Sequence, residues 1–162
     1  RPVTINNGYV MRAWYDISNT NGEDELGIRN SQKAIDALIE NEIQNGIASD
    51  NVLLAGFSQG GVMALQVGLR HNNPLGGIIA LSCYLSQADT LLDEAASVNA
   101  KIPIYMSHGS KDSVIPISRA VTSKEILLAA NYPVEWYEYP MAHSVCMEEI
   151  EDISCWLLRF MK

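Results

Sequence analysis

The sequence predicts an α/β fold, with a mostly parallel sheet that is covered by helices on both faces. Short apolar stretches that resemble strands alternate along the chain with longer segments of helical periodicity. Connections of this length imply right-handed crossovers between parallel strands. The chain has 162 residues, of which 48% are hydrophobic and 19% are charged, as is typical of a packed globular protein. We therefore expect a single domain over residues 1–162.

The first strongly periodic segment is residues 25–45, which we predict to be an amphipathic helix. Gly46 follows as a helix stop. The acidic residues at 23–25 would meet the positive end of the helix dipole, and we interpret them as capping residues rather than as a metal site. One stripe of the helix carries the apolar side chains Ile28, Ile35, Leu38, Ile39 and Ile43.

The segment 52–57 is apolar, too short for a helix and flanked by breakers, which predicts a buried parallel strand. Before residue 25 the chain is rich in turn residues, at 6–8 and 19–22, and only 9–17 is expected to hold a short extended piece. The remaining predicted elements are helices over 60–69, 116–130 and 147–160, and strands over 77–81, 102–106 and 134–139.

The charge balance argues against several classes of partner. A net charge of −8 would repel nucleic acid and anionic membrane surfaces. No apolar run reaches the roughly 18 residues of a membrane span, so no stable membrane insertion is expected, and the start of the chain lacks the layout of a signal peptide. Cys83, Cys146 and Cys155 fit neither a disulfide framework nor a zinc site. We expect free thiols, a cytoplasmic location, and neither metal nor cofactor.

The most informative motif is Gly56-Phe57-Ser58-Gln59-Gly60, a G-x-S-x-G pattern between a predicted strand and a predicted helix. In this context the serine sits on a sharp turn with its hydroxyl exposed, and the flanking glycines avoid collisions where strand and helix converge. The backbone N–H of Gln59 would lie at a helix N-terminus and face a developing oxyanion. Ser58 is therefore the candidate nucleophile, although the glycines alone would also suit tight packing.

A nucleophilic serine needs a histidine base, and the chain has three histidines. His71 falls at the end of the helix after Ser58, away from the carboxyl ends of the strands, and is expected to be a solvated helix cap. His108 follows a strand but precedes any candidate acid. His143 lies in the loop after the last strand, where functional side chains of an open sheet gather.

Asp112, in the loop after the penultimate strand, is the candidate acid that would orient the base. A loop aspartate is often only a turn former. However, Ser58, Asp112 and His143 follow successive strand ends in the order Ser, Asp, His, which is the order of an α/β-hydrolase fold. The three placements agree with one another, and together they predict a serine hydrolase.

Several motifs together closely resemble the phospholipase/carboxylesterase family, which includes acyl-protein thioesterases and bacterial carboxylesterases. The resemblance covers essentially the whole chain. It implies ester or thioester hydrolysis through an acyl-enzyme, with Ser58 as nucleophile, His143 as general base and Asp112 as orienting acid. The motifs are Gly56 to Gly61, Leu81 to Leu85, His108-Gly109 followed by Asp112 and Pro116, Met141 to Ser144, Arg1 to Thr4, and Met11 to Ile17.

One departure from the family pattern concerns the oxyanion hole. Family members carry an earlier strand that ends in an L-H-G-x-G segment and supplies a second backbone donor, and this sequence contains no such segment. We therefore expect an N-terminally truncated version of the fold. Either this sequence is a fragment of a longer gene product, or a partner or a second copy, as in a homodimer, covers the exposed sheet edge. The alternative function is a non-catalytic remnant or binding module of the same fold. A dienelactone-hydrolase-like enzyme is less favoured, because it would carry cysteine at the position of Ser58.

The resemblance also suggests apolar contacts for the acyl group, at Trp14, Tyr84, Leu85 and Met141. Each of these residues would equally suit an ordinary core position. The substrate classes that remain open are small esters, lysophospholipids and acylated proteins, because the choice depends on a groove that loops build.

Overall fold

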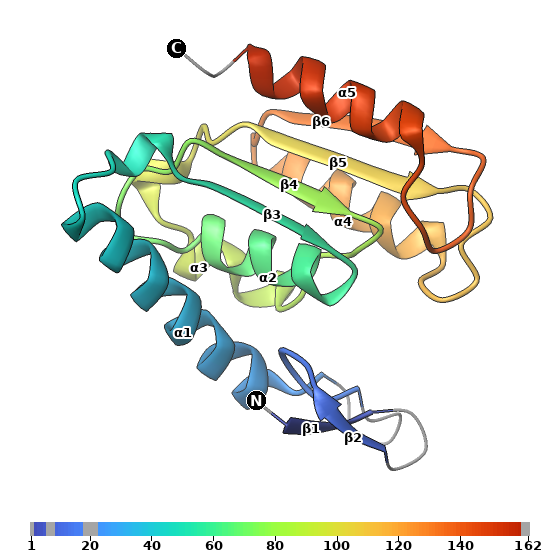
Figure 1. The fold of residues 1–162 in the computed structure, drawn as a ribbon, viewed down its shortest axis with the longest axis horizontal. Helices are drawn as coiled ribbons and strands as arrows, with labels where there is room; N and C mark the ends of the chain where they lie inside the picture. Colours follow the sequence, from blue (N-terminus) through green and yellow to red (C-terminus); the bar gives the residue numbers. More distant parts are fainter. Residues whose placement is uncertain (1, 6–8, 18–22, 160–162) are drawn as a thin grey trace.

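A sheet of four parallel strands lies at the centre of the computed structural model, in the order β3-β4-β5-β6 (Figure 1). Each strand pairs with the next one in sequence, so every connection is a crossover of the kind that parallel pairing requires. The structure describes residues 2–5, 9–17 and 23–159. The strands of the sheet are β3 (Leu53–Phe57), β4 (Gly77–Leu81), β5 (Ile104–Gly109) and β6 (Val134–Tyr139).

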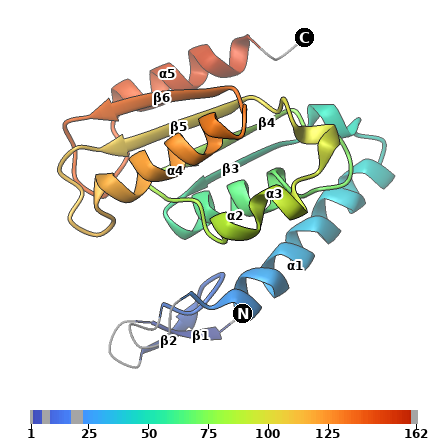
Figure 2. The same ribbon diagram turned by 180° about the vertical axis from the view of Figure 1, so that it is seen from behind.

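Helices cover both faces of this sheet, as the sequence predicted. α2 and α4 lie on one face, with the short α3 beside α2 (Figure 2), and α5 lies on the other (Figure 1). The core is correspondingly divided: the larger cluster includes Ile78 and Met106, while a smaller one joins Ile79 and Tyr105 to Trp156 of α5. The helices are α1 (Glu25–Gln44), α2 (Gln59–Gly68), α3 (Leu91–Glu94), α4 (Ile117–Ala129) and α5 (Met147–Leu158).

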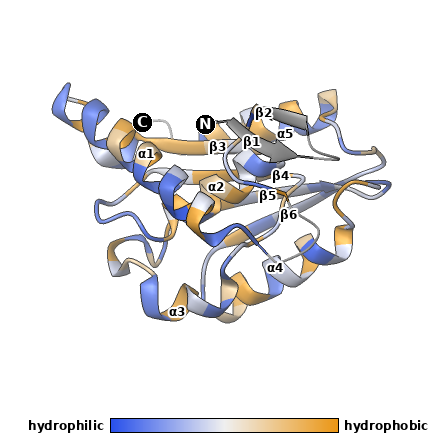
Figure 3. Ribbon diagram, turned by 90° about the horizontal axis from the view of Figure 1, so that it is seen from below, coloured by the Kyte–Doolittle hydropathy of each residue, from blue (hydrophilic) through white to orange (hydrophobic). Residues whose placement is uncertain are grey.

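The helix predicted over 25–45 is α1, which begins and ends where the sequence signals indicated. A carboxylate oxygen of Asp24 accepts a hydrogen bond from the backbone N–H of Gly27 at 2.9 Å, which confirms the capping role expected there. Beyond the helix, Gly46 has a φ of 96°, which favours glycine. Hydrophobic and hydrophilic segments alternate along α1 (Figure 3), as expected of a helix with one buried face.

An antiparallel pair of short strands near the start of the chain lies away from the central sheet, beside the first turns of α1 (Figure 1). β2 (Tyr9–Arg12) lies within the extended piece predicted for 9–17, whereas β1 (Pro2–Ile5) was not predicted as a strand. The two strands pair antiparallel, with Val3 opposite Met11. A strand of four residues depends on its partner more than on its own propensity, which explains why composition alone did not reveal it. The turns predicted at 6–8 and 19–22 lie outside the described residues.

Two predicted strands differ from the observed ones. The strand predicted at 102–106 begins at Ile104 and continues to Gly109, so it includes the buried polar residues Ser107 and His108. The prediction followed apolar residues only, but a strand between two others can bury polar side chains that find partners. The strand at 52–57 was expected to be buried. Within the described residues β3 is instead an edge strand, and its Ala55 is exposed.

Candidate active site

Ser58 occupies a sharp turn between β3 and α2. Its φ of 55° and ψ of −121° are unusual for a residue other than glycine. The neighbouring strand holds this backbone in place, since the N–H of Ser58 donates to the carbonyl of Leu81 at 2.9 Å. Gln59 is the first residue of α2, so its own N–H has no acceptor within the helix. The backbone therefore forms the sharp strand-to-helix turn predicted from G-x-S-x-G, which we call the elbow.

Close backbone packing explains one of the flanking glycines. A Cβ atom at Gly56 would lie 2.1 Å from the backbone of Gly60, which no side chain can tolerate. At Gly60 itself an added Cβ would meet no described atom within 4 Å, so the expectation that both glycines avoid collisions was wrong for Gly60. The second crowded position is Gly61, where a Cβ would approach the sulfur of Cys83 to 2.7 Å.

The side chains of Ser58, His143 and Asp112 form a continuous hydrogen-bonded row. Nε2 of His143 lies 2.9 Å from Oγ of Ser58, and its Nδ1 lies 2.7 Å from Oδ2 of Asp112. They come from three loops that follow β3, β5 and β6, so the three candidates chosen from the sequence meet at one edge of the sheet. The loop that carries His143 passes close to Gly109, where a Cβ would lie 2.4 Å from the carbonyl oxygen of Met141.

The carboxylate of Asp112 is completely buried but is well supplied with hydrogen bonds. Its Oδ1 accepts from the backbone N–H groups of Val114 and Ile115, at 2.8 and 2.9 Å. Burial raises the pKa of this carboxyl, but the hydrogen bonds from His143 and the two amides outweigh burial, so the pKa lies below its usual range. Asp112 is therefore an ionised acceptor beside a histidine that keeps 16% of its side chain exposed.

The other two histidines are buried, and neither lies between Ser58 and Asp112. His71 was expected to be a solvated helix cap, which is wrong: it is 4% exposed, and its Nδ1 lies 3.0 Å from a carboxylate oxygen of Asp36 on α1. His71 is buried because α1 packs beside α2, and the local sequence around His71 does not reveal that contact. Nε2 of His108 lies 2.9 Å from the carbonyl oxygen of Ile115 and 3.3 Å from Oδ2 of Asp112, behind the row described above.

Glu149 is a buried carboxyl that the sequence analysis did not single out. It lies in the first turn of α5, where a surface carboxylate ordinarily interacts favourably with the positive end of the helix dipole. Here its side chain is 0% exposed, and it accepts a hydrogen bond from Oγ of Ser107 at 2.5 Å. Burial is the largest influence on Glu149 and raises its pKa, although the bond from Ser107 opposes the rise. The contact attaches the start of α5, just after the His143 loop, to β5.

A groove of about 360 Å³ opens beside Ser58. Much of its surface is apolar, and it includes three large side chains that are unusually exposed, namely Met11, Trp14 and Ile17, at 53%, 40% and 48%. Arg12 contributes one positive charge. The remaining lining residues are Ala13, Phe57, Ser58, Gln59 and Gly60.

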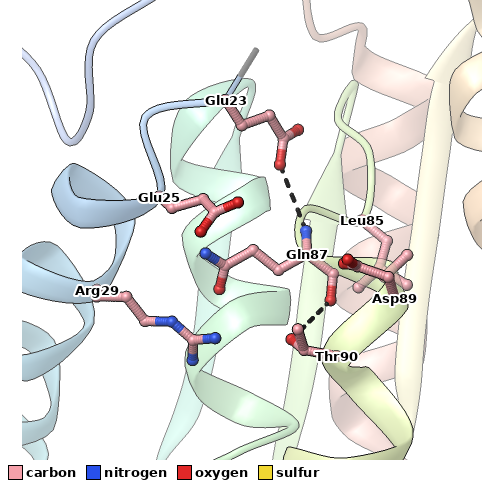
Figure 4. A pocket seen from close by; sticks show the side chains of 8 residues that line it. Glu23, Glu25, Arg29, Leu85, Gln87, Asp89 and Thr90 are labelled. Atoms are coloured by element: carbon pink, nitrogen blue, oxygen red, sulfur yellow. Dashed lines mark hydrogen bonds between the residues drawn. The ribbon is translucent and has the colours of Figure 1, made fainter. Parts of the chain in front are cut away.

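Of the four residues suggested as acyl contacts, only Trp14 lines this groove. Leu85 instead lines a separate groove of about 410 Å³, most of whose lining residues are polar or charged (Figure 4), and there Glu23 accepts a hydrogen bond from the backbone of Gln87. The ring of Tyr84 lies beneath the guanidinium of Arg119, at 3.6 Å from the centroid. Met141 is buried, and its carbonyl accepts from the N–H of Lys111.

Neither a metal site nor a membrane span is found in the part of the chain that the structure describes. There, no three histidine, cysteine or acidic side chains come together as metal ligands would. Likewise, no described helix is both long and apolar enough to span a bilayer.

Comparison with known proteins places the chain among hydrolases. The model of the Phospholipase/Carboxylesterase family matches residues 1–160. Acyl-protein thioesterase 1 of Gibberella zeae is 38% identical over 96% of this chain and 71% of its own length, and the Neurospora crassa protein of the same name is 40% identical over 96% and 68%. The crystal structure of Arabidopsis thaliana SOBER1 superposes with a TM-score of 0.91 at 30% identity, over 99% of this chain and 80% of that one. The resemblance noted in the sequence is confirmed, and the chain belongs to the phospholipase/carboxylesterase family, with the α/β-hydrolase fold.

Proposed function

We propose that this protein is a serine hydrolase that cleaves carboxylic esters or acyl thioesters through an acyl-enzyme on Ser58. The observation that carries the proposal is the row of contacts from Ser58 Oγ to His143 Nε2, at 2.9 Å, and from His143 Nδ1 to Asp112 Oδ2, at 2.7 Å. Both distances are within hydrogen-bond range. A serine, a base and an orienting acid in this geometry are what nucleophilic acyl transfer requires.

In the first half-reaction, Oγ of Ser58 bonds to the carbonyl carbon of the substrate while Nε2 of His143 takes the hydroxyl proton. The carbonyl oxygen becomes an oxyanion, for which the N–H of Gln59 at the start of α2 is the proposed donor. The bond to the leaving alcohol or thiol then breaks, and His143 returns the proton to that group. Asp112, whose pKa lies below the usual range, stays ionised and stabilises the imidazolium.

In the second half-reaction, water replaces the departed group. His143 takes a proton from the water as its oxygen bonds to the acyl carbon, and a second oxyanion forms in the same position. When the bond from carbon to Ser58 Oγ breaks, His143 returns the proton to Oγ. The products are the carboxylic acid and the free enzyme, so no cofactor is consumed.

Two observations favour an acyl group with an apolar chain. The groove beside Ser58 exposes Met11, Trp14 and Ile17, which would bury a hydrocarbon chain favourably. In addition, the two fungal relatives carry the name acyl-protein thioesterase 1. We therefore propose acyl thioesters, including those of acylated proteins, as the favoured substrates, with small esters and lysophospholipids as the other candidates.

Labelling by a fluorophosphonate probe tests the proposal directly. We expect the purified protein to be labelled once per chain and to hydrolyse p-nitrophenyl esters, and the Ser58→Ala variant to lose both properties. Ser154→Ala serves as the matched control, because Ser154 lies on the exposed surface of α5 and, among the described residues, its hydroxyl bonds to the carbonyl of Ile150 in the same helix. Labelling that persists in Ser58→Ala would refute Ser58 as nucleophile. A parent protein that neither labels nor hydrolyses would instead support the non-catalytic binding module.

A further inference from the structure

The side chain of Gln59 makes two hydrogen bonds that the proposed chemistry does not use. Its Oε1 accepts from the backbone N–H of Trp14 at 3.2 Å, and its Nε2 donates to the carbonyl of Tyr15 at 3.0 Å. A carboxamide offers one acceptor and two donors, so it can satisfy the backbone groups of two successive residues at once. Residues 13–17 belong to no helix or strand, and the Gln59 amide takes the place of a neighbouring strand.

The same segment is attached from its other side by α1. Oγ of Ser31 donates to the carbonyl of Trp14, and the N–H of Asp16 donates to the Asp24 carboxylate at 2.9 Å. Both backbone groups of Trp14 are therefore bonded to side chains from two different helices, although its indole is 40% exposed. Tyr15 is 3% exposed and packs inward. The arrangement holds Trp14 at the surface while its backbone is immobilised.

Immobilising Trp14 matters because it lines the groove that also contains Ser58. We propose that Gln59 and Ser31 act as a positioning pair that holds Trp14 as the apolar wall of this groove, and that they thereby set the preference for acyl chain length. The inference rests on the proposed hydrolase function. It assigns to the Gln59 side chain a task separate from that of its backbone N–H, so the two can be tested independently.

The contribution of the Trp14 wall to kcat/KM should increase with the length of the acyl chain. Each methylene group that leaves water for an apolar surface favours the transition state by about fourfold in kcat/KM. An acetyl group offers almost no such area, whereas an octanoyl group offers six more methylenes. A loosened wall should therefore reduce kcat/KM for long esters and leave short esters nearly unchanged.

The experiment compares kcat/KM for p-nitrophenyl acetate, butyrate, hexanoate and octanoate. Gln59→Met removes the amide but keeps the backbone N–H, and Ser31→Ala loosens the wall from α1. For both variants we expect the ratio of octanoate to acetate activity to fall by about tenfold or more. In Ser31→Ala, which changes no residue of the groove lining, acetate activity should fall by less than about threefold. Gln66→Met is the matched control, because its amide lies in the same helix but pairs with Gln32 and Gln87; its ratio should equal that of the parent.

Amide hydrogen exchange gives a second measurement that does not depend on catalysis. The N–H of Trp14 should exchange slowly in the parent protein and much faster in Gln59→Met, but not in Gln66→Met. The inference is overturned if Gln59→Met and Ser31→Ala keep the chain-length ratio of the parent, if they lose all esters equally, or if Trp14 exchanges fast in the parent. A parent protein that hydrolyses no ester would defeat the proposed function. The exchange rates would still decide whether Gln59 holds the backbone of Trp14. Because the two substitutions are on different helices, misfolding of one variant leaves the other as the test.

Discussion

Two regions of the molecule meet at Ser58, and they are held in place in different ways. The residues of the candidate row follow β3, β5 and β6, whose backbones are joined by the continuous pairing of a parallel sheet. The groove wall, formed by Trp14 in the irregular segment 13–17, lies outside that sheet. It is attached through single side chains, chiefly those of Gln59 and Ser31.

This difference separates chemistry from recognition. Backbone pairing between strands is cooperative and does not depend on any one side chain, so the reacting atoms keep their spacing when a surface residue changes. A wall held by a few side-chain hydrogen bonds can be altered by one substitution, each bond being worth about 1 kcal/mol. Changes at the strand ends should therefore affect rate or folding, whereas changes around the wall should affect which substrate is preferred.

The largest expected effect on the strand-end region comes from Asp112→Asn. The amide would still accept from the Val114 and Ile115 amides, but it would not stabilise an imidazolium, and it would favour the wrong tautomer of His143. We expect kcat for p-nitrophenyl acetate to fall by about 10⁴-fold with little change in KM. Asp93→Asn, on the exposed surface of α3, should match the parent. A decrease of less than about tenfold in Asp112→Asn would argue against the proposed role.

A second prediction concerns Gly56 and Gly60, the two glycines that flank Ser58 in the elbow. They are the same residue type but have different surroundings. Gly56→Ala should destabilise the fold by about 3 kcal/mol or more, because its Cβ would collide with backbone. Gly60→Ala should change the free energy of unfolding by less than about 1 kcal/mol, since helix α2 has room there. Urea unfolding monitored by circular dichroism measures both values. Equal destabilisation by the two substitutions would contradict the packing described for the elbow.

The smallest expected effect is a pH dependence of stability at Glu149, which attaches α5 to β5. Its pKa is raised in the folded protein, so its contribution is most favourable at low pH and is lost as the pH rises through that raised value. A glutamine side chain at this position would not ionise. The Glu149→Gln variant should therefore gain in urea midpoint relative to the parent between pH 4.5 and pH 8.

The control for this measurement is Glu125→Gln, which alters an exposed carboxyl inside α4, outside the first turn of that helix. Its difference from the parent should not change over the same pH range. A difference between Glu149→Gln and the parent that stays constant from pH 4.5 to pH 8, or that moves in the opposite direction, would show that the buried carboxyl is paired more fully than its contacts indicate.

Much of the strand-end region could be predicted from the sequence, for a reason that lies in sheet geometry. Parallel strands place their carboxyl ends at one edge, so the residues directly after each strand are brought together whatever the details of packing. For this reason Asp112 and His143 could be chosen from order and position once the G-x-S-x-G motif had indicated Ser58. The groove wall could be predicted less well from the sequence. Family resemblance alone pointed to Trp14, and no sequence pattern indicated its hydrogen bonds with Gln59 and Ser31.

Periodicity, breakers and motif spacing are local properties of the chain. They were enough to predict the α/β alternation, the capped helix α1, the sharp turn at Ser58 and the membership in a hydrolase family. Packing of the helices on the sheet decides the other features. Within the described residues β3 lies at the sheet edge, His71 and Glu149 are buried, Gly61 rather than Gly60 is crowded, and the Gln59 side chain bonds to the backbone of Trp14. These features depend on atoms distant in sequence, and their energies arise from contact, burial and hydrogen bonding that appear only when the helices pack on the sheet.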